Sequence, residues 1–230
     1  MSSKRKTIVV SAVSLRKGGT LTILQDCLCY LSALAADGNY RVIALVHKRE
    51  LADYPHIEYI EMPDVIKGWG RRLWCEYVTM YKLSQKIMPV YLWLSLHDAT
   101  PRVVAERRVV YCQTSFPFYK WSWRDFLFDY KIVLFALFTR WIYRINVHRN
   151  TYLIVQQEWL RSGLSRMLGV KKEKFIVAPP ERKENDVIAE IVELSSFMLP
   201  HQIAIRILSC YATLLLCWNK SLEKEGSKWS

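Results

Sequence analysis

The sequence predicts an α/β fold in which helices flank a parallel β-sheet. Up to Pro179-Pro180, β-branched apolar runs alternate with longer segments of helical periodicity, and turn residues separate them. Half of the 230 residues are apolar, which is enough for a sizeable core. Parallel strands need right-handed crossover connections, so we expect helices on the faces of the sheet.

The first strand and helix show this alternation most clearly. Residues 7–14 (TIVVSAVS) are a β-branched run typical of a buried parallel strand. Residues 16–19 form a glycine turn, and Thr20 is expected to cap the helix that follows. Residues 37–39 (DGN) end this helix, whose leucines recur at helical spacing: Leu21, Leu24, Leu28, Leu31 and Leu34.

The later elements continue the alternation. Further strands are expected at residues 40–46, 57–61, 90–96, 108–112, 151–156 and 175–177. Helices are expected at residues 69–87, 126–147 and 158–168, with a short helix or turn near residues 48–54. Four charged residues interrupt the apolar segment 126–147, so we expect a core helix there and no membrane span.

The chain divides near Pro179-Pro180 into a domain at residues 1–183 and an irregular or helical tail at residues 184–230. The domain holds 29 Lys and Arg against 15 Asp and Glu, whereas the tail holds four against six. A basic domain rich in Trp and Tyr suits an anionic partner, and a solvated basic surface is the alternative.

The cysteines predict neither zinc binding nor disulfides. No two of them form a C-x-x-C pair, and no His lies at finger spacing. Buried free thiols in a reducing cytoplasm are the simplest account. The cysteines are Cys27, Cys29, Cys75, Cys112, Cys210 and Cys217.

Candidate ligand-binding residues follow two of the predicted strands. Gly18 and Gly19 lie where a helix begins, and there backbone N–H groups and the helix dipole favour an anion. Neither G-x-G-x-x-G nor G-x-x-x-x-G-K occurs, so a plain structural turn is the alternative. His97 and Asp98 either face the same cleft or cap the segment before Pro101.

Four segments together resemble family 4 glycosyltransferases, which are sugar-nucleotide-dependent enzymes with two facing Rossmann-like domains, the GT-B fold. The strand and glycine turn at residues 7–20 are similar to the start of that family's N-terminal domain. Residues 111–118 (YCQTSFPF) are similar to its acceptor-cleft loop, and residues 151–168 (TYLIVQQEWLRSGLSRML) to a later strand and helix. Residues 169–180 (GVKKEKFIVAPP) are similar to the strand before the interdomain hinge, so the resemblance covers roughly residues 6–183.

The resemblance implies a Rossmann-like acceptor-side domain of an enzyme that moves a sugar from a nucleotide-sugar donor to a hydroxyl of a glycan or lipid-linked acceptor. Many members carry a His in the acceptor loop, where this chain has Gln113. No metal and no cofactor beyond the nucleotide-sugar substrate are implied. The donor diphosphate would lie near Gly18, Gly19 and Thr20, and the acceptor cleft would include Gln113, Thr114, Ser115 and Phe116. The candidates for a catalytic role are His97, Asp98 and Gln113.

The family's donor site lies mostly in a second domain, with an E-x7-E pair that nothing after Pro180 supplies. We therefore expect this chain to be truncated and inactive alone, with loose order after about residue 184. A shift of reading frame near Ser196 would explain the tail, because permitted codons read one base out of frame can encode a strand, a turn and a leucine helix.

The alternative is a non-catalytic Rossmann-like module that binds an anionic membrane surface or partner. Residues 69–72 (WGRR) combine aromatic and basic side chains, as interfacial segments do, although core packing with snorkelling basic ends has the same composition. The expected partners are a nucleotide sugar, a glycan or lipid-linked acceptor and an anionic membrane, and not nucleic acid. We expect a cytoplasmic protein, including a peripheral location on the cytoplasmic face of the membrane.

Overall fold

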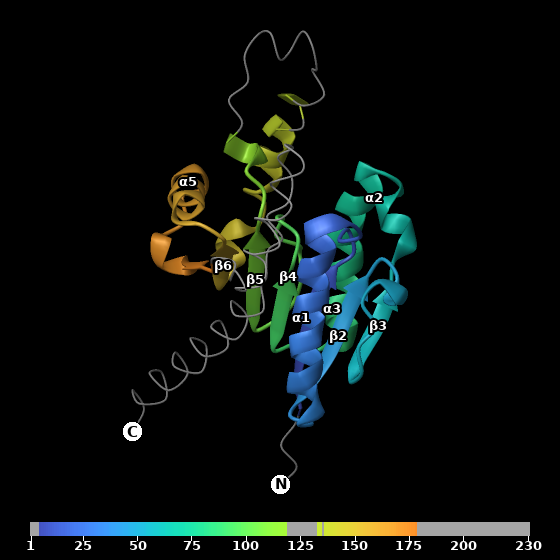
Figure 1. The fold of residues 1–230 in the computed structure, drawn as a ribbon. Coiled ribbons are helices and arrows are strands. Elements are labelled where there is room, and N and C mark those ends of the chain that lie inside the picture. Colours follow the sequence, from blue (N-terminus) through green and yellow to red (C-terminus); the bar gives the residue numbers. More distant parts are fainter. Residues whose placement is uncertain (1–4, 119–132, 135, 179–230) are drawn as a thin grey trace, which may run out of the picture.

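The fold is a parallel α/β sheet with flanking helices (Figure 1). The computed structural model describes residues 5–118, 133–134 and 136–178. Seven strands pair in the order β3-β2-β1-β4-β5-β6-β7, and every pairing is parallel. The strand order reverses between β1 and β4, as it does in a doubly wound Rossmann-like sheet. The predicted fold class is confirmed.

The strands lie where the sequence predicts them, with small differences at their ends. Residue 15 turns back to donate its N–H to the carbonyl of Ala12, so the first strand ends two residues earlier than expected. The fourth strand is also shorter than the predicted 90–96. The observed bounds are β1 Lys6–Ala12, β2 Tyr40–Val46, β3 Ile57–Glu61, β4 Leu92–Ser95, β5 Arg107–Cys112, β6 Tyr152–Val155 and β7 Phe175–Val177.

Helices pack on both faces of this sheet. Helix α1 (Gly18–Ala36) packs on one face, where its buried side chains join Val10, Ala44 and Leu94 in one core cluster. Helix α3 (Met80–Ile87) lies on the opposite face, as Figure 1 shows, and its core cluster includes Trp93. Helix α5 (Glu158–Leu168) packs against β5, β6 and β7. Strand residues therefore alternate between two apolar layers, which accounts for their continuous apolar runs.

Helix α1 begins before the residue that was predicted to cap it. The helix starts at Gly18, its N-cap is Lys17, and no side chain caps it. Thr20 lies inside the first turn, where its hydroxyl donates back to the carbonyl of Lys17 at 2.8 Å. The prediction of Thr20 as N-cap is wrong because the helix already begins at Gly18. By length and composition α1 could cross a membrane, but its apolar side is part of the domain core.

The predicted helix at residues 69–87 is divided into three parts. Helix α2 (Trp69–Trp74) is followed by a π-helical segment (Cys75–Thr79) and then by α3. A π-helical segment holds one extra residue per turn and changes which side chains face inward. Here it buries Glu76, a charged residue that apolar periodicity would place on the surface.

The predicted helix at residues 126–147 differs in extent and in burial. Residues 119–132 and 135 lie outside the described part of the chain, and the helix ends at residue 142. Asn146 adopts the left-handed conformation with φ of 59°, which Asn tolerates and a helix does not. Within residues 133–134 and 136–142, the expected core helix buries one side, through Val133, Ala136 and Ile142. Its other side exposes Leu134, Leu137, Phe138 and Trp141.

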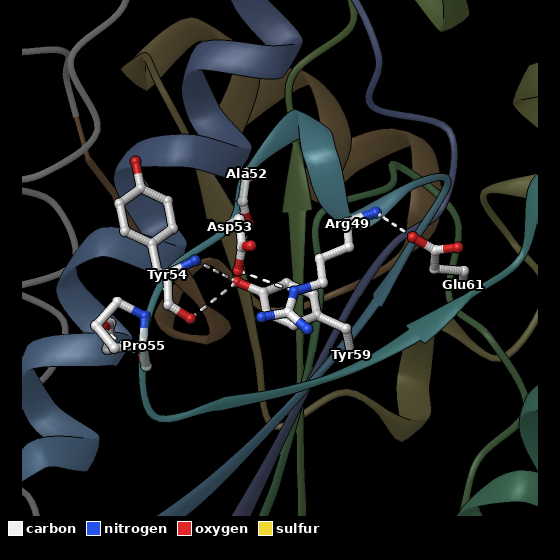
Figure 2. Close-up of polar contacts among 8 residues, drawn as sticks. Arg49, Ala52, Asp53, Tyr54, Pro55, Tyr59 and Glu61 are labelled. Carbon is white, nitrogen blue, oxygen red and sulfur yellow. Dashed lines mark hydrogen bonds and ion pairs between the residues drawn. The ribbon is translucent and has the colours of Figure 1, made fainter.

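The connection between β2 and β3 is held by hydrogen bonds to Tyr59 and Glu61 (Figure 2). The Tyr59 hydroxyl donates to the carbonyl of Ala52 at 2.8 Å and accepts the N–H of Tyr54 at 2.9 Å. The backbone N–H of Arg49 donates to the Glu61 carboxylate at 2.6 Å. These contacts close the loop onto β3.

Of the described cysteines, Cys27, Cys75 and Cys112 are buried, whereas Cys29 is exposed. The expectation of buried thiols is therefore wrong for Cys29, because residues two apart on a helix face different sides. The interdomain hinge at Pro179-Pro180 and the tail at residues 184–230 lie outside the described residues.

Candidate functional site

A cavity of about 360 Å³ opens at the carboxyl edge of the sheet. Its walls come from the turn after β1, the first turn of α1, the segments after β4 and β5, and helix α2. In an open α/β sheet this edge is the usual ligand site, near the place where the strand order reverses. The lining residues are Ser14, Leu15, Thr20, Arg72, Leu96, His97, Asp98, Gln113, Thr114 and Ser115.

Most residues proposed from the sequence line this cavity. Thr20, His97 and Asp98 do so, together with the three residues that begin the acceptor loop, 113–115. Gly18 and Gly19 are not lining residues, but they form the adjacent first turn of α1. Gly18 has φ of +60°, and no heavy atom lies within 4 Å of a Cβ added at either glycine. The side chain of Phe116 lies outside the described residues.

His97 is buried, and its two ring nitrogens differ in their surroundings. Nδ1 lies 2.8 Å from the hydroxyl of Ser14. Nε2 is buried and has no hydrogen-bond partner among the described residues. Burial, together with the positive charge of Arg72, lowers the pKa of His97 to about 3. The ring is therefore neutral at physiological pH, so it can offer Nε2 to a ligand hydroxyl but is a poor base.

Asp98 holds the acceptor loop and does not cap its own segment. One carboxylate oxygen, Oδ1, accepts the N–H of Gln113 at 2.7 Å and the N–H of Thr114 at 3.1 Å. The Gln113 side-chain amide also donates to the carbonyl of Leu96 at 3.1 Å. Burial raises the pKa of Asp98, and the two backbone donors oppose that shift. Asp98 thus joins the ends of β4 and β5.

Arg72 and Glu76 form an ion pair that the sequence analysis missed. Arg72 Nε lies 3.1 Å from Glu76 Oε1, and the Glu76 side chain is only 2% exposed against 29% for Arg72. Burial raises the pKa of Glu76, and the charge of Arg72 opposes this. An Arg–Glu pair four residues apart was visible in the sequence, but the burial of Glu76 within a π-helical segment was not.

The arrangement suits a polar ligand that carries negative charge. Arg72 contributes a guanidinium, and the start of α1 contributes backbone N–H groups beside Thr20. His97 contributes a neutral ring nitrogen. Within the described ranges, no three His, Cys, Asp or Glu side chains are placed to hold a metal ion. The absence of a metal from the reaction stays a prediction.

Comparisons with known proteins give a structural similarity alone. No family model and no curated protein matches the chain. A solved structure described as a glycosyltransferase from Rickettsia africae ESF-5 is similar to it, with 12% sequence identity and a TM-score of 0.44. The match covers 85% of this chain and 51% of that protein, so the chain spans about half of its length. A likeness of this extent assigns neither an activity nor a substrate.

Proposed function

We propose that this chain is the acceptor-side domain of a family 4 glycosyltransferase of the GT-B fold. The intact enzyme would transfer a sugar from a nucleotide-sugar donor to a hydroxyl of a glycan or lipid-linked acceptor. One observation carries the proposal: Thr20, assigned to the donor turn, and residues 113–115, assigned to the acceptor loop, line one cavity, although they lie about 90 residues apart. These residues come together because of the order of the strands in the sheet, which is an observation independent of the sequence resemblance.

Each part of the cavity has a role in this proposal. The open backbone at Gly18 and Gly19 lets a diphosphate approach the start of α1, where N–H groups stabilise the negative charge of the leaving group. Residues 113–115 contact the acceptor. The neutral ring of His97 orients a sugar hydroxyl through Nε2. Asp98 positions the acceptor loop, since its Oδ1 already binds two backbone N–H groups.

Backbone NMR of the full chain tests this proposal with a panel of UDP-, GDP-, ADP- and CMP-sugars. We expect at least one of them to shift the amide signals of Gly18, Gly19 and Thr20, with a weak affinity because an acceptor-side domain supplies only part of the family's donor site. A panel that shifts no signal around the cavity, or shifts only signals on other surfaces, contradicts the proposal.

Gly19→Ala supplies a specific variant. The added Cβ meets no heavy atom within 4 Å, so the fold tolerates it, while the methyl group occupies the space into which the ligand would approach. We expect nucleotide-sugar binding to weaken by about tenfold or more, which corresponds to about 1.4 kcal/mol. Gly70→Ala in α2 is the matched control, because its Cβ is equally unhindered and it lies outside the first turn of α1.

We also propose that the reading frame shifts near residue 196, because permitted codons read one base out of frame can encode a strand, a turn and a leucine helix. The coding DNA read in the displaced frame should continue into a second Rossmann-like domain with an E-x7-E pair. A stop codon or an unrelated sequence in that frame would refute this part of the proposal. It would leave the acceptor-side assignment of residues 1–183 untouched.

A second candidate function is binding to an anionic membrane surface, and one specific observation favours it. Trp69, Phe138 and Trp141 form an exposed aromatic cluster in which Trp69 and Phe138 meet edge to face at 5.8 Å. Arg71 and Arg140 lie beside these aromatic residues in the sequence. Aromatic rings with adjacent basic residues are typical of surfaces that enter the lipid headgroup region.

Vesicle sedimentation separates the two candidates. A membrane-binding module should sediment with vesicles that contain phosphatidylglycerol and remain unbound with phosphatidylcholine alone. The double variant Trp69→Ser/Trp141→Ser should abolish sedimentation, whereas Trp159→Ser, an exposed Trp on α5, should not. Vesicle binding without any response to nucleotide sugars would favour the membrane module over the transferase domain.

A further inference from the structure

A second cavity of about 260 Å³ adjoins the first, and the two share Ser14 and Arg72. Its other walls include Arg16, Gly68 and Trp69. Two guanidinium groups therefore line a small space, and no carboxylate is among its lining residues. A cavity with this balance of charge favours an anionic group with several oxygen atoms.

Arg72 is held with part of its hydrogen-bonding capacity unused. Its Nε binds Glu76, which is buried behind it, and its guanidinium lies 5.5 Å from the ring centroid of Trp69. Among the described residues, its side chain makes no further hydrogen bond, so the terminal nitrogens are available to a ligand. Arg fork geometry matches two oxygens of a phosphate. The Glu76 contact fixes the side chain before a ligand arrives, which lowers the entropic cost of binding.

Arg16 supplies the second positive charge from a different element. It follows β1, is exposed, and forms no ion pair within the described ranges. Its charge extends toward β2, where it helps to lower the pKa of His47. The two arginines are 56 positions apart in the sequence. They line the same cavity because the turn after β1, which carries Arg16, lies next to helix α2, which carries Arg72.

We propose that this second cavity binds a phosphate group of the acceptor, next to the hydroxyl that receives the sugar. The inference rests on the proposed function, because it assigns the first cavity to sugar transfer and the second to the charged part of the same acceptor. Since both cavities contain Ser14 and Arg72, a phosphate held by Arg16 and Arg72 would leave the attached sugar directed into the first cavity. The acceptor is therefore a phosphorylated sugar, either soluble or attached to a lipid.

Calorimetric titration of the full chain with glucose 1-phosphate and with glucose tests the charge requirement. We expect glucose 1-phosphate to bind at least about tenfold more tightly than glucose, as expected for hydrogen bonds to a charged group. Arg16→Gln and Arg72→Gln should each weaken glucose 1-phosphate binding by about tenfold. Arg71→Gln, which removes the same charge from the adjacent position outside this cavity, should leave it unchanged.

Arg72→Gln leaves Glu76 buried without its partner, so Arg72→Gln/Glu76→Gln is measured beside it. The double variant keeps two polar side chains and removes both charges. Arg16 is exposed, and its substitution does not disturb the fold. Equal binding of glucose and glucose 1-phosphate, or an equal loss in Arg71→Gln, would overturn the inference. Competition between UDP and glucose 1-phosphate would also overturn it, because the cavity would then belong to the donor.

Two further measurements are needed. One distinguishes a soluble acceptor from a lipid-linked acceptor, and the other distinguishes failure of the proposed function from failure of the phosphate site. Binding of soluble glucose 1-phosphate supports a soluble acceptor. Arg16-dependent sedimentation with vesicles of phosphatidylglycerol, whose headgroup is a phosphodiester, supports a lipid-linked one. Amide shifts at residues 18–20 with UDP-glucose are recorded in the same samples. Phosphate binding without those shifts refutes the proposed function alone, and the shifts without phosphate binding refute this inference alone.

Discussion

The hydroxyl of Ser14 lies 2.8 Å from Nδ1 of His97, and this contact joins the ends of β1 and β4. The two residues are 83 positions apart and meet because β4 pairs directly with β1 in the sheet. With Nδ1 paired to Ser14, the buried Nε2 is the ring atom left for a ligand. The pairing of β1 with β4 therefore determines which ring nitrogen of His97 is left unpaired beside the cavity.

The burial of His97 predicts a pH-dependent loss of stability. Its pKa is about 3 in the folded protein, whereas an unfolded His has a pKa of about 6.5. The unfolded chain therefore binds the proton more tightly, and stability falls as the pH decreases below about 6.5. Between pH 7.5 and 5 the wild type should lose about 2 kcal/mol more than His97→Gln.

Urea unfolding of both proteins at the two pH values measures this difference. The buried carboxyls Glu76 and Asp98, whose pKa values are raised, act in the opposite direction. They are present in both proteins, so their effects cancel in the comparison. A wild type and variant that follow the same pH dependence would show that His97 is accessible to protons in the folded state.

Removing Arg72 should destabilise the domain much more than removing a surface arginine. Arg72→Ala leaves Glu76 buried and unpaired, which typically costs about 3–5 kcal/mol. Arg49→Ala breaks an exposed pair with Asp53 and should cost less than about 1 kcal/mol. The free energies of unfolding at pH 7.5 decide between these values. Burial raises the pKa of Glu76, so the Arg72→Ala loss should shrink as the pH falls and Glu76 becomes protonated. A loss that is constant with pH would contradict the assignment.

Asp98 should control the order of the acceptor loop. Asp98→Ala removes the acceptor for the N–H groups of Gln113 and Thr114, and we expect a cost of about 2–3 kcal/mol. Hydrogen exchange of these two amides should accelerate more than exchange in β2, which lies on the other side of β1. Asp98→Asn keeps an acceptor oxygen and should restore part of the protection. Unchanged exchange at Gln113 in Asp98→Ala would refute this role.

Thiol reactivity should separate Cys29 from the buried cysteines. Burial raises the pKa of Cys75 to about 11 and that of Cys112 well above its ordinary value. Both thiols are therefore protonated and inaccessible at pH 8, whereas Cys29 is exposed. Iodoacetamide labelling followed by peptide mass spectrometry should show rapid modification of Cys29 and slow modification of Cys75 and Cys112. Equal labelling rates would mean that the core opens readily.

Local patterns were sufficient to predict most elements of the fold. The strands at Tyr40–Val46, Ile57–Glu61 and Phe175–Val177 and the helix at Glu158–Leu168 have the predicted bounds. Their β-branched runs, helical spacing and glycine ends depend on residues close together in the chain. The π-helical segment at Cys75–Thr79 was not predicted. It shifts the apolar spacing by a single residue, and a shift this small is not distinguishable from ordinary α-helical periodicity in the sequence.

The sequence by itself determined the strand–helix alternation, the glycine turn and the polar segments that follow the strands. It left open whether His97 and Asp98 face a cleft or cap a turn, since both interpretations use the same residues. Only the tertiary structure decided that His97 pairs with Ser14, that Asp98 holds residues 113 and 114, and that Arg72 is fixed by a buried Glu76. The His97 and Asp98 contacts join segments that follow different strands, and the Arg72–Glu76 contact, although local, is buried by the packing of its helix. Their geometry depends on strand order and helix packing, which local periodicity does not encode.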